Sequence, residues 1–177
     1  MNKIILKMLK ILFLYILISS SICDNSKKIR DFLKSKGLSK VGIASIMGNL
    51  YAESQLNPNS YDKLGQRKTG LSITEYIRKT NDGTYTNFVK DSIGFGIAHW
   101  TLWTKKKKLL ENCEGIISDL DCQLNFLFSE IENDISFYTF LKETNDLVES
   151  CDIVFSFLKP TIQEFDKKRR LHCKRFL

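Results

Sequence analysis

The chain has 177 residues, with 27 lysines and arginines against 20 aspartates and glutamates, which gives a formal net charge of +7. This length is enough for one domain with a real core and is short for two. The basic residues are scattered, so the charge suits a polyanionic partner such as a cell-wall polymer and does not point to nucleic acid.

The first 23 residues have the features of a secretory signal peptide. An apolar run at residues 11–18 is followed by small side chains, and it is preceded by the basic residues Lys3, Lys7 and Lys10. The apolar run is short for a membrane span, so an uncleaved anchor is the less favoured alternative. We expect cleavage near residue 23 and a secreted mature chain, residues 24–177, without stable membrane insertion.

The mature chain begins with two expected helices. Ser26 is a suitable N-cap for the first, which would end at Gly37, and Ser39 is a suitable N-cap for the second. Gly42 and Gly48 lie inside the second helix, where each glycine costs about 1 kcal/mol relative to alanine. We therefore expect a neighbouring backbone to approach this helix closely.

Glu53 continues the apolar stripe of the second helix, which consists of Ile43, Ile46 and Leu50. Residues 57–59, Asn-Pro-Asn, force a turn, so Glu53 is predicted in the last helical turn at the edge of the buried face. A carboxyl group partly withdrawn from water there favours its protonated form, as a general acid requires. A solvated carboxylate is the alternative, and a salt bridge that keeps Glu53 ionised would contradict the acid role.

Residues 55–101 are predicted to form an irregular insert. Residues 59–71 are polar and rich in turn formers, Ser72 and Glu75 make a capping box for a short helix, and residues 84–89 alternate enough for a brief extended segment. Residues 91–101, DSIGFGIAHWT, combine two glycines with aromatic side chains. This spacing predicts a backbone close to a flat group, either a ligand or another helix, and it is not the spacing of a phosphate loop.

The rest of the chain is predicted to be helical over residues 102–112, 120–135, 137–141, 151–158 and 162–176. A dense basic run, Lys105 to Lys108, is best explained as a solvated face of the first of these helices.

Cleavage after Cys23 would leave four cysteines, and an even number in an exported chain indicates two disulfides. Three pairings are possible. We favour Cys113 with Cys122, which closes a short loop between helices, and Cys151 with Cys173, which joins the ends of two antiparallel helices. The cysteine spacing disfavours a zinc site, so no metal is expected.

The order of these motifs resembles the phage tail lysozyme family of lysozyme-like peptidoglycan hydrolases. A helix with GNLYAES, a polar insert, DSIGFGIAHWT and a basic helix carry the resemblance, and DLDCQLNFLFSEI and FLKP…KKRR extend it over about residues 28–170. It implies a mainly α, α+β lysozyme-like fold, a single helical domain whose short irregular or β insert forms one wall of a cleft. It also implies a monomeric enzyme without cofactor that cleaves the β-1,4 bond between N-acetylmuramic acid and N-acetylglucosamine in bacterial peptidoglycan.

By this resemblance, Glu53 matches the catalytic glutamate and residues 94–101 line the opposite wall of the sugar cleft. Glycoside hydrolysis also uses a second carboxylate. Asp91 is the best candidate because it borders residues 94–101, the glycine segment, and Asp62 is the runner-up. The candidate substrate-binding residues are Trp100, His99, Ser92, Tyr51 and Asn57.

Among these, Trp100 is expected to stack on a sugar ring, and Asn57 to brace the turn after Glu53. His99 stands where related members carry glutamine, and it could bind substrate with a dependence on pH or fill the core.

Other functions remain open at this point. If neither Asp91 nor Asp62 contributes, the substrate can assist itself and yield the anhydro-muramic product of a lytic transglycosylase. A membrane-active basic helical antibacterial protein and a catalytically inactive wall-binding module are further alternatives. A cysteine peptidase that uses Cys113 or Cys122 with His99 would need a free thiol.

Overall fold

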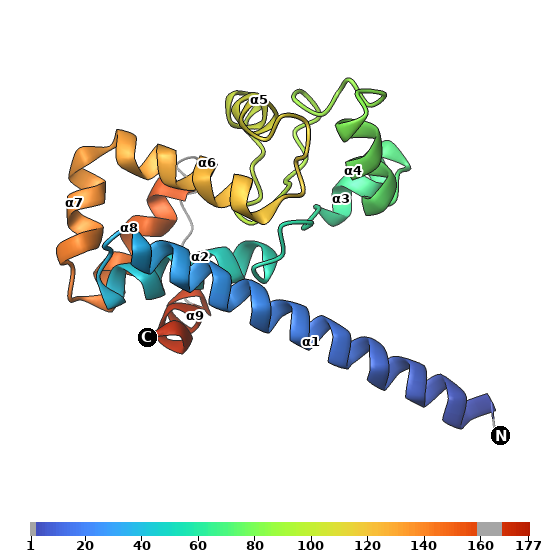
Figure 1. Cartoon of the computed structure of the whole chain (residues 1–177), viewed down its shortest axis with the longest axis horizontal. Helices are drawn as coiled ribbons and strands as arrows, with labels where there is room; N and C mark the ends of the chain where they lie inside the picture. The colour runs from blue at the N-terminus through green and yellow to red at the C-terminus, as the bar shows by residue number, and fades with distance from the viewer. Residues whose placement is uncertain (1–2, 159–167) are drawn as a thin grey trace.

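Helices form nearly all the regular structure in the computed structural model, which describes residues 3–158 and 168–177 (Figure 1). They are α1 (Lys3–Ser35), α2 (Lys40–Ser54), α3 (Lys63–Thr69), α4 (Ile73–Asn81), α5 (Trp103–Asn112), α6 (Leu120–Asn133), α7 (Ile135–Glu143), α8 (Leu147–Leu158) and α9 (Lys168–Phe176). Pairing between extended residues is limited, in the described part, to isolated bridges of Phe95 with Tyr61 and with Trp100. The predicted mainly α fold is confirmed.

Helix α1 is continuous from Lys3 to Ser35, so the predicted helix start at Ser26 is wrong. Residues 3–35 contain neither glycine nor proline, and nothing in the sequence breaks the helix between the apolar run and the mature region. The first part of α1 extends away from the other helices (Figure 1). Among the described residues, no helix is both long and apolar enough to cross a membrane.

Helix α2 is the central element of the core. It packs against α1, α7, α8 and α9, and every residue from Gly42 to Leu50 is buried. Ser39 caps it as predicted, because its side chain accepts a hydrogen bond of 2.9 Å from the Gly42 N–H. The helix ends at Ser54, and Gln55 then takes a left-handed backbone conformation.

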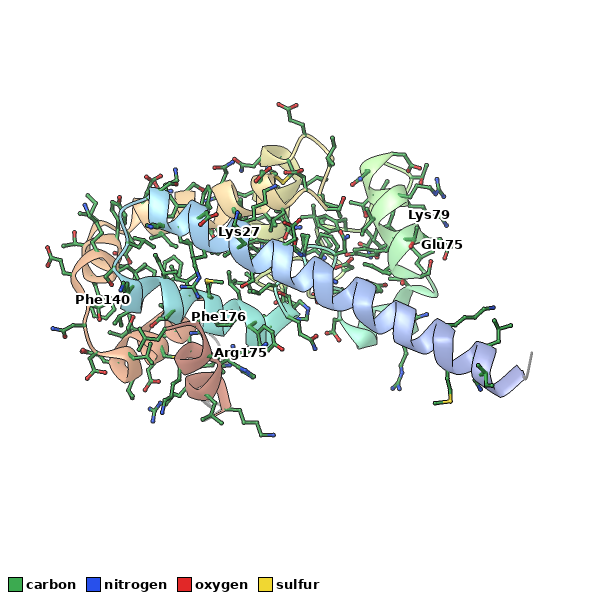
Figure 2. The ribbon with its side chains drawn as sticks, turned by 60° about the horizontal axis from the view of Figure 1, so that its bottom comes forward. Lys27, Glu75, Lys79, Phe140, Arg175 and Phe176 are labelled. Carbon is green, nitrogen blue, oxygen red and sulfur yellow. A yellow bond between two sulfur atoms is a disulfide. The ribbon has the colours of Figure 1, made fainter. Side chains whose placement is uncertain are left out.

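The two glycines of α2 allow the close backbone approach that the sequence predicts. A Cβ at Gly42 would lie 2.3 Å from the Leu141 carbonyl oxygen, and one at Gly48 would lie 2.4 Å from the Cys173 Cα. Helix α9 therefore lies directly on α2 at Gly48, with Arg175 and Phe176 at its far end (Figure 2).

The insert between α2 and α5 departs from two expectations. Residues 63–69 form α3, although the sequence predicts turns there, and residues 84–89 form turns instead of an extended segment. Asp82 explains the second difference, because its Oδ1 accepts from the Thr84 N–H at 3.0 Å and folds the chain back on α4. The predicted capping box of Ser72 and Glu75 opens α4.

Two disulfides join helices in the second half of the chain. Cys113 at the end of α5 pairs with Cys122 in α6, and Cys151 in α8 pairs with Cys173 in α9. These are the pairings that the sequence favours, and they leave none of the four cysteines as the free thiol of a peptidase. Helix α8 begins at Leu147, earlier than predicted, and residues 162–167 of the predicted last helix lie outside the described residues.

Replacement of Gly48 by alanine should destabilise the protein by about 1–3 kcal/mol, because the new methyl group collides with the backbone of α9. Thermal and urea denaturation would measure the change. Asn125→Ala, at an exposed position of α6, is the control and should shift the stability by no more than about 0.5 kcal/mol. Equal stability of Gly48→Ala and wild type would show that α9 does not lie this close to α2.

Candidate active site

Glu53 occupies the last turn of α2, where three parts of the chain meet. Its side chain is only 8% exposed. The Arg169 guanidinium of α9 donates a hydrogen bond from Nη2 to Glu53 Oε1, and His99 Nδ1 lies 3.9 Å from Glu53 Oε2. Ser54, the next residue, donates from Oγ to the Ile97 carbonyl at 2.8 Å and so fixes the end of α2 to the glycine segment.

Arg169 corrects the sequence-based view of Glu53. The predicted withdrawal from water is confirmed, but the carboxyl group has a guanidinium partner. Such an ion pair is the arrangement that the sequence-based view named as contrary to the acid role. Arg169 lies 116 residues from Glu53, and its only signal in the sequence was the closing KKRR of the family resemblance.

His99 connects Glu53 to an open pocket. Its ring is 23% exposed, and its Nε2 lies 2.6 Å from Ser60 Oγ. Ser60 in turn lines a pocket of about 410 Å³, whose other lining residues are Asn57, Asn59, Tyr61, Gln66, Ser72 and Ile73. The chain of contacts from Glu53 through His99 to Ser60 thus reaches a space that a ligand can enter. Sequence reasoning did not single out Ser60.

The backbone around this chain of contacts adopts unusual conformations. His99 has a φ of 48°, and Gln55 and Leu56, directly after α2, have φ values of 55° and 62°. Non-glycine residues adopt such angles only where their surroundings impose them. At Leu56 one such constraint comes from α1, because Asn25 Nδ2 donates to the Leu56 carbonyl at 3.0 Å.

Gln123 fixes the two walls of the site relative to each other. Its buried side chain donates to the carbonyls of Pro58 and Ile117 at 2.8 and 2.7 Å, and its Oε1 accepts from the Ile97 N–H at 2.8 Å. One amide therefore connects the loop after α2 with the glycine segment. The signal in the sequence was a polar residue three positions after Leu120, on the apolar face of α6.

Asp91 belongs to the core and not to the site. Its side chain is 3% exposed and forms an ion pair with Lys106, whose side chain is fully buried. The Tyr76 hydroxyl donates to Asp91 Oδ2 at 2.7 Å, and the Ile93 N–H donates to Oδ1 at 2.9 Å. An enclosed carboxylate with these partners is not open to a sugar, so the predicted role as second catalytic carboxylate is not supported.

Lys106 corrects the view of the basic run as a solvated face. Burial lowers the pKa of the Lys106 ammonium, and the hydrogen bond and the charge of Asp91 oppose that shift. Burial and the hydrogen bond to Asp91 also raise the pKa of the Tyr76 hydroxyl. This cluster therefore holds its charges as a pair, and removal of one partner would leave the other buried alone.

The remaining predicted substrate-binding residues lie in different surroundings. Trp100 is 6% exposed, and its ring packs on Phe126 and against Gly96, so it is a core residue and does not stack on sugar. The flat group that the glycine segment approaches is thus a ring from the same segment. Tyr51 packs under Arg175 of α9, whose Nη1 donates to its hydroxyl at 3.1 Å.

Ser92 and Asn57 lie on the surface. Ser92 is exposed, with a φ of 56°. Asn57 lines the pocket and braces the turn after α2, as expected, because its Oδ1 accepts from the Asn59 N–H at 2.9 Å. Of the predicted site residues, the structure therefore groups Glu53, His99 and Asn57, and it separates Asp91 and Trp100 from them.

A family model, described as phage tail lysozyme, matches residues 24–174 of the chain. The chain belongs to this family. Membership makes the protein a peptidoglycan hydrolase of the lysozyme type. The matched residues include Glu53, His99 and Arg169, so all three groups that meet at the end of α2 lie within the part of the chain that defines the family.

Lys106→Met should destabilise this lysozyme-like protein by about 3–5 kcal/mol, because it leaves Asp91 charged and buried without its partner. Urea denaturation at neutral pH would measure the loss. Lys107→Met is the matched control, since Lys107 pairs with Glu111 at the surface and its loss should cost no more than about 0.5 kcal/mol. The double variant Lys106→Met with Asp91→Asn should lose less than the two single losses added together.

Proposed function

We propose that the protein is a secreted glycosidase that cleaves the β-1,4 bond between N-acetylmuramic acid and N-acetylglucosamine, with Glu53 as the proton donor. The observation that supports this role most directly is the position of Glu53, an 8% exposed carboxyl group at the end of α2, linked through His99 and Ser60 to an open pocket. We also propose that residues 1–23 are removed as a signal peptide. In support, the family match begins at residue 24.

In the proposed reaction, Glu53 gives its proton to the oxygen of the glycosidic bond as that bond breaks. The sugar passes through a state with oxocarbenium character, and the carbon C1 is then captured by water or by a hydroxyl group. The atom that attacks C1 returns a proton to the Glu53 carboxylate, so the enzyme ends in its starting form. The ion pair between Arg169 and Glu53 counts against this role, and the activity of Glu53→Gln decides the question.

The fate of C1 distinguishes two versions of this function. A hydrolase of this kind uses a second carboxylate, and with Asp91 enclosed in the core, Asp62 is the remaining candidate. Asp62 is half-buried, next to Tyr61 of the pocket lining. A lytic transglycosylase needs no second carboxylate, because the C6 hydroxyl of muramic acid attacks C1. The enclosure of Asp91 gives this alternative specific support.

Glu53→Gln should reduce the release of fragments from purified peptidoglycan by at least about 100-fold, because the amide cannot donate the required proton. Binding to sedimented cell walls and the thermal midpoint should change little, since glutamine has nearly the same shape. Glu132→Gln, an exposed position on α6, is the control and should keep full activity. Full activity of Glu53→Gln would remove Glu53 from the reaction.

Mass spectrometry of peptidoglycan digests would distinguish the two versions. Fragments that end in reducing muramic acid indicate hydrolysis, and in that case Asp62→Asn should be strongly impaired. Fragments that end in 1,6-anhydro-muramic acid indicate transglycosylation, and Asp62→Asn should then remain active. New free amino groups, without new sugar ends, would contradict the glycosidase proposal.

A further inference from the structure

The two disulfides differ in how closely a dissolved molecule can approach them. Cys151 and Cys173 are both 0% exposed, so the bridge between them is closed to solvent. Cys113 is 5% exposed, whereas Cys122 is half-buried, and both line a surface pocket of about 230 Å³. A small thiol can therefore reach the Cys113–Cys122 bridge, and Cys122 carries the more accessible sulfur.

The pocket beside this bridge, which we call the bridge pocket, carries negative charge. Its lining residues, apart from the two cysteines, are Asn112, Glu114, Ile116 and Asp119. Glu114 and Asp119 are exposed carboxylates, and none of the described residues that line the pocket is basic. Thiol–disulfide exchange is carried out by a thiolate, which negative charge repels. A thiolate with its own ammonium group is repelled least, so the bridge pocket favours a cationic aminothiol over an anionic thiol.

The bridge closes the loop between α5 and α6, residues 113–122, and this loop supports the walls of the candidate active site. Ile117 of the loop is fully buried, and its carbonyl accepts a hydrogen bond of 2.7 Å from Gln123, the residue directly after Cys122. Gln123 in turn accepts from the Ile97 N–H of the glycine segment at 2.8 Å. The bridge therefore restrains both Gln123 and the loop that holds its side chain.

We propose that the Cys113–Cys122 bridge is a site of covalent modification by small cationic aminothiols, and that its opening loosens the hold of Gln123 on the glycine segment. The aminothiol enters through the bridge pocket. This inference goes beyond the proposed function, because it concerns a bond and a pocket that take no part in the cleavage of a glycan.

The modification proceeds by two exchange steps. A thiolate attacks Cys122 Sγ, the bond to Cys113 breaks, and Cys113 leaves as a thiolate that takes up a proton from water. Cys122 then carries the aminothiol in a mixed disulfide. A second thiolate attacks the sulfur of the bound aminothiol and releases Cys122 as a thiolate. Two aminothiols are thus oxidised to one disulfide, and the protein disulfide is reduced to two thiols.

The first test is treatment of the folded, full-length protein with cysteamine, with samples quenched by iodoacetamide at intervals. Mass spectrometry of the proteolytic peptides reports on each cysteine separately. We expect the Cys113–Cys122 bridge to open at least about 10-fold faster than the Cys151–Cys173 bridge, with cysteamine bound first to Cys122. Equal rates at the two bridges, or first attachment to Cys113, would overturn the inference.

The charge preference is tested with cysteamine, 2-mercaptoethanol and 2-mercaptoethanesulfonate, whose substituents are cationic, neutral and anionic. Each opening rate is corrected for the thiolate fraction and divided by the rate on an uncharged linear peptide disulfide. Cysteamine should exceed the sulfonate by about 3–10-fold at low salt, and about 1 M salt should nearly abolish the difference. No difference at low salt would overturn the assignment to aminothiols.

Glu114→Gln identifies the source of that preference. This variant removes one carboxylate from the bridge pocket, so the ratio of the cysteamine rate to the sulfonate rate should fall. Glu132→Gln is the matched control, because Glu132 is an exposed carboxylate of α6 that does not line the pocket, and its ratio should equal that of wild type. Equal ratios in both variants would contradict a role of the pocket charge.

Amide hydrogen exchange tests the link to Gln123 without peptidoglycan. After opening of this bridge alone, the Ile97 N–H should exchange at least about 10-fold faster, because Gln123 holds it less firmly. The Ile43 N–H, which donates at 2.9 Å to the backbone at the start of α2, is the control and should keep its rate. An unchanged Ile97 rate would overturn the link, and so would an equal acceleration at Ile43, which indicates a general loss of stability.

Discussion

The close contact between α2 and α9 determines the geometry of the whole site. The two helices touch at Gly48 and Cys173. Glu53 follows Gly48 by about one turn of α2, and Arg169, its hydrogen-bond partner, precedes Cys173 by about one turn of α9. A helix rises about 1.5 Å per residue, so the two intervals, five and four residues, span similar lengths of about 7.5 and 6 Å. The ion pair is therefore a geometric consequence of an antiparallel approach that only a glycine permits.

The same contact explains why a buried charge is tolerated at this place. Glu53 follows the last apolar turn of α2, where neighbouring helices exclude water, and a lone carboxylate there would be costly. Arg169 compensates part of that cost, and the ring of Phe155 covers its guanidinium. The arrangement favours a defined geometry of the carboxyl group at the expense of stability, as is usual where side chains have a chemical task.

Local features of the structure were largely predictable from the sequence. The Ser39 cap, the position of Glu53 in the last turn and the close approach at Gly48 all follow from patterns within α2 itself. The capping box before α4 is equally local. In each case the residues that decide the structure lie within about one helical turn of each other, which is the range over which sequence patterns act.

The partners of charged residues were not predictable in the same way. Nothing in a local pattern shows that Glu53 meets Arg169, because the two are 116 residues apart and the contact depends on packing. Lys106 is an intermediate case. It lies within a run of four lysines, but its position three residues before the buried Leu109 places it on the inner face of α5. The spacing relative to Leu109 indicated a buried position for Lys106, whereas the composition of the lysine run indicated a solvated face.

The hydrogen bond from Asn25 to the Leu56 carbonyl links α1 to the turn that follows α2. In the full chain, Asn25 lies in the middle of the long helix α1. Cleavage near residue 23 would make it one of the first residues of the mature protein, where the N–H groups of a helix have no partners and the chain end frays. Precursor and mature enzyme would then differ in how firmly they support the strained turn that follows α2. The proposed removal of residues 1–23 would thus also change how the loop beside Glu53 is supported.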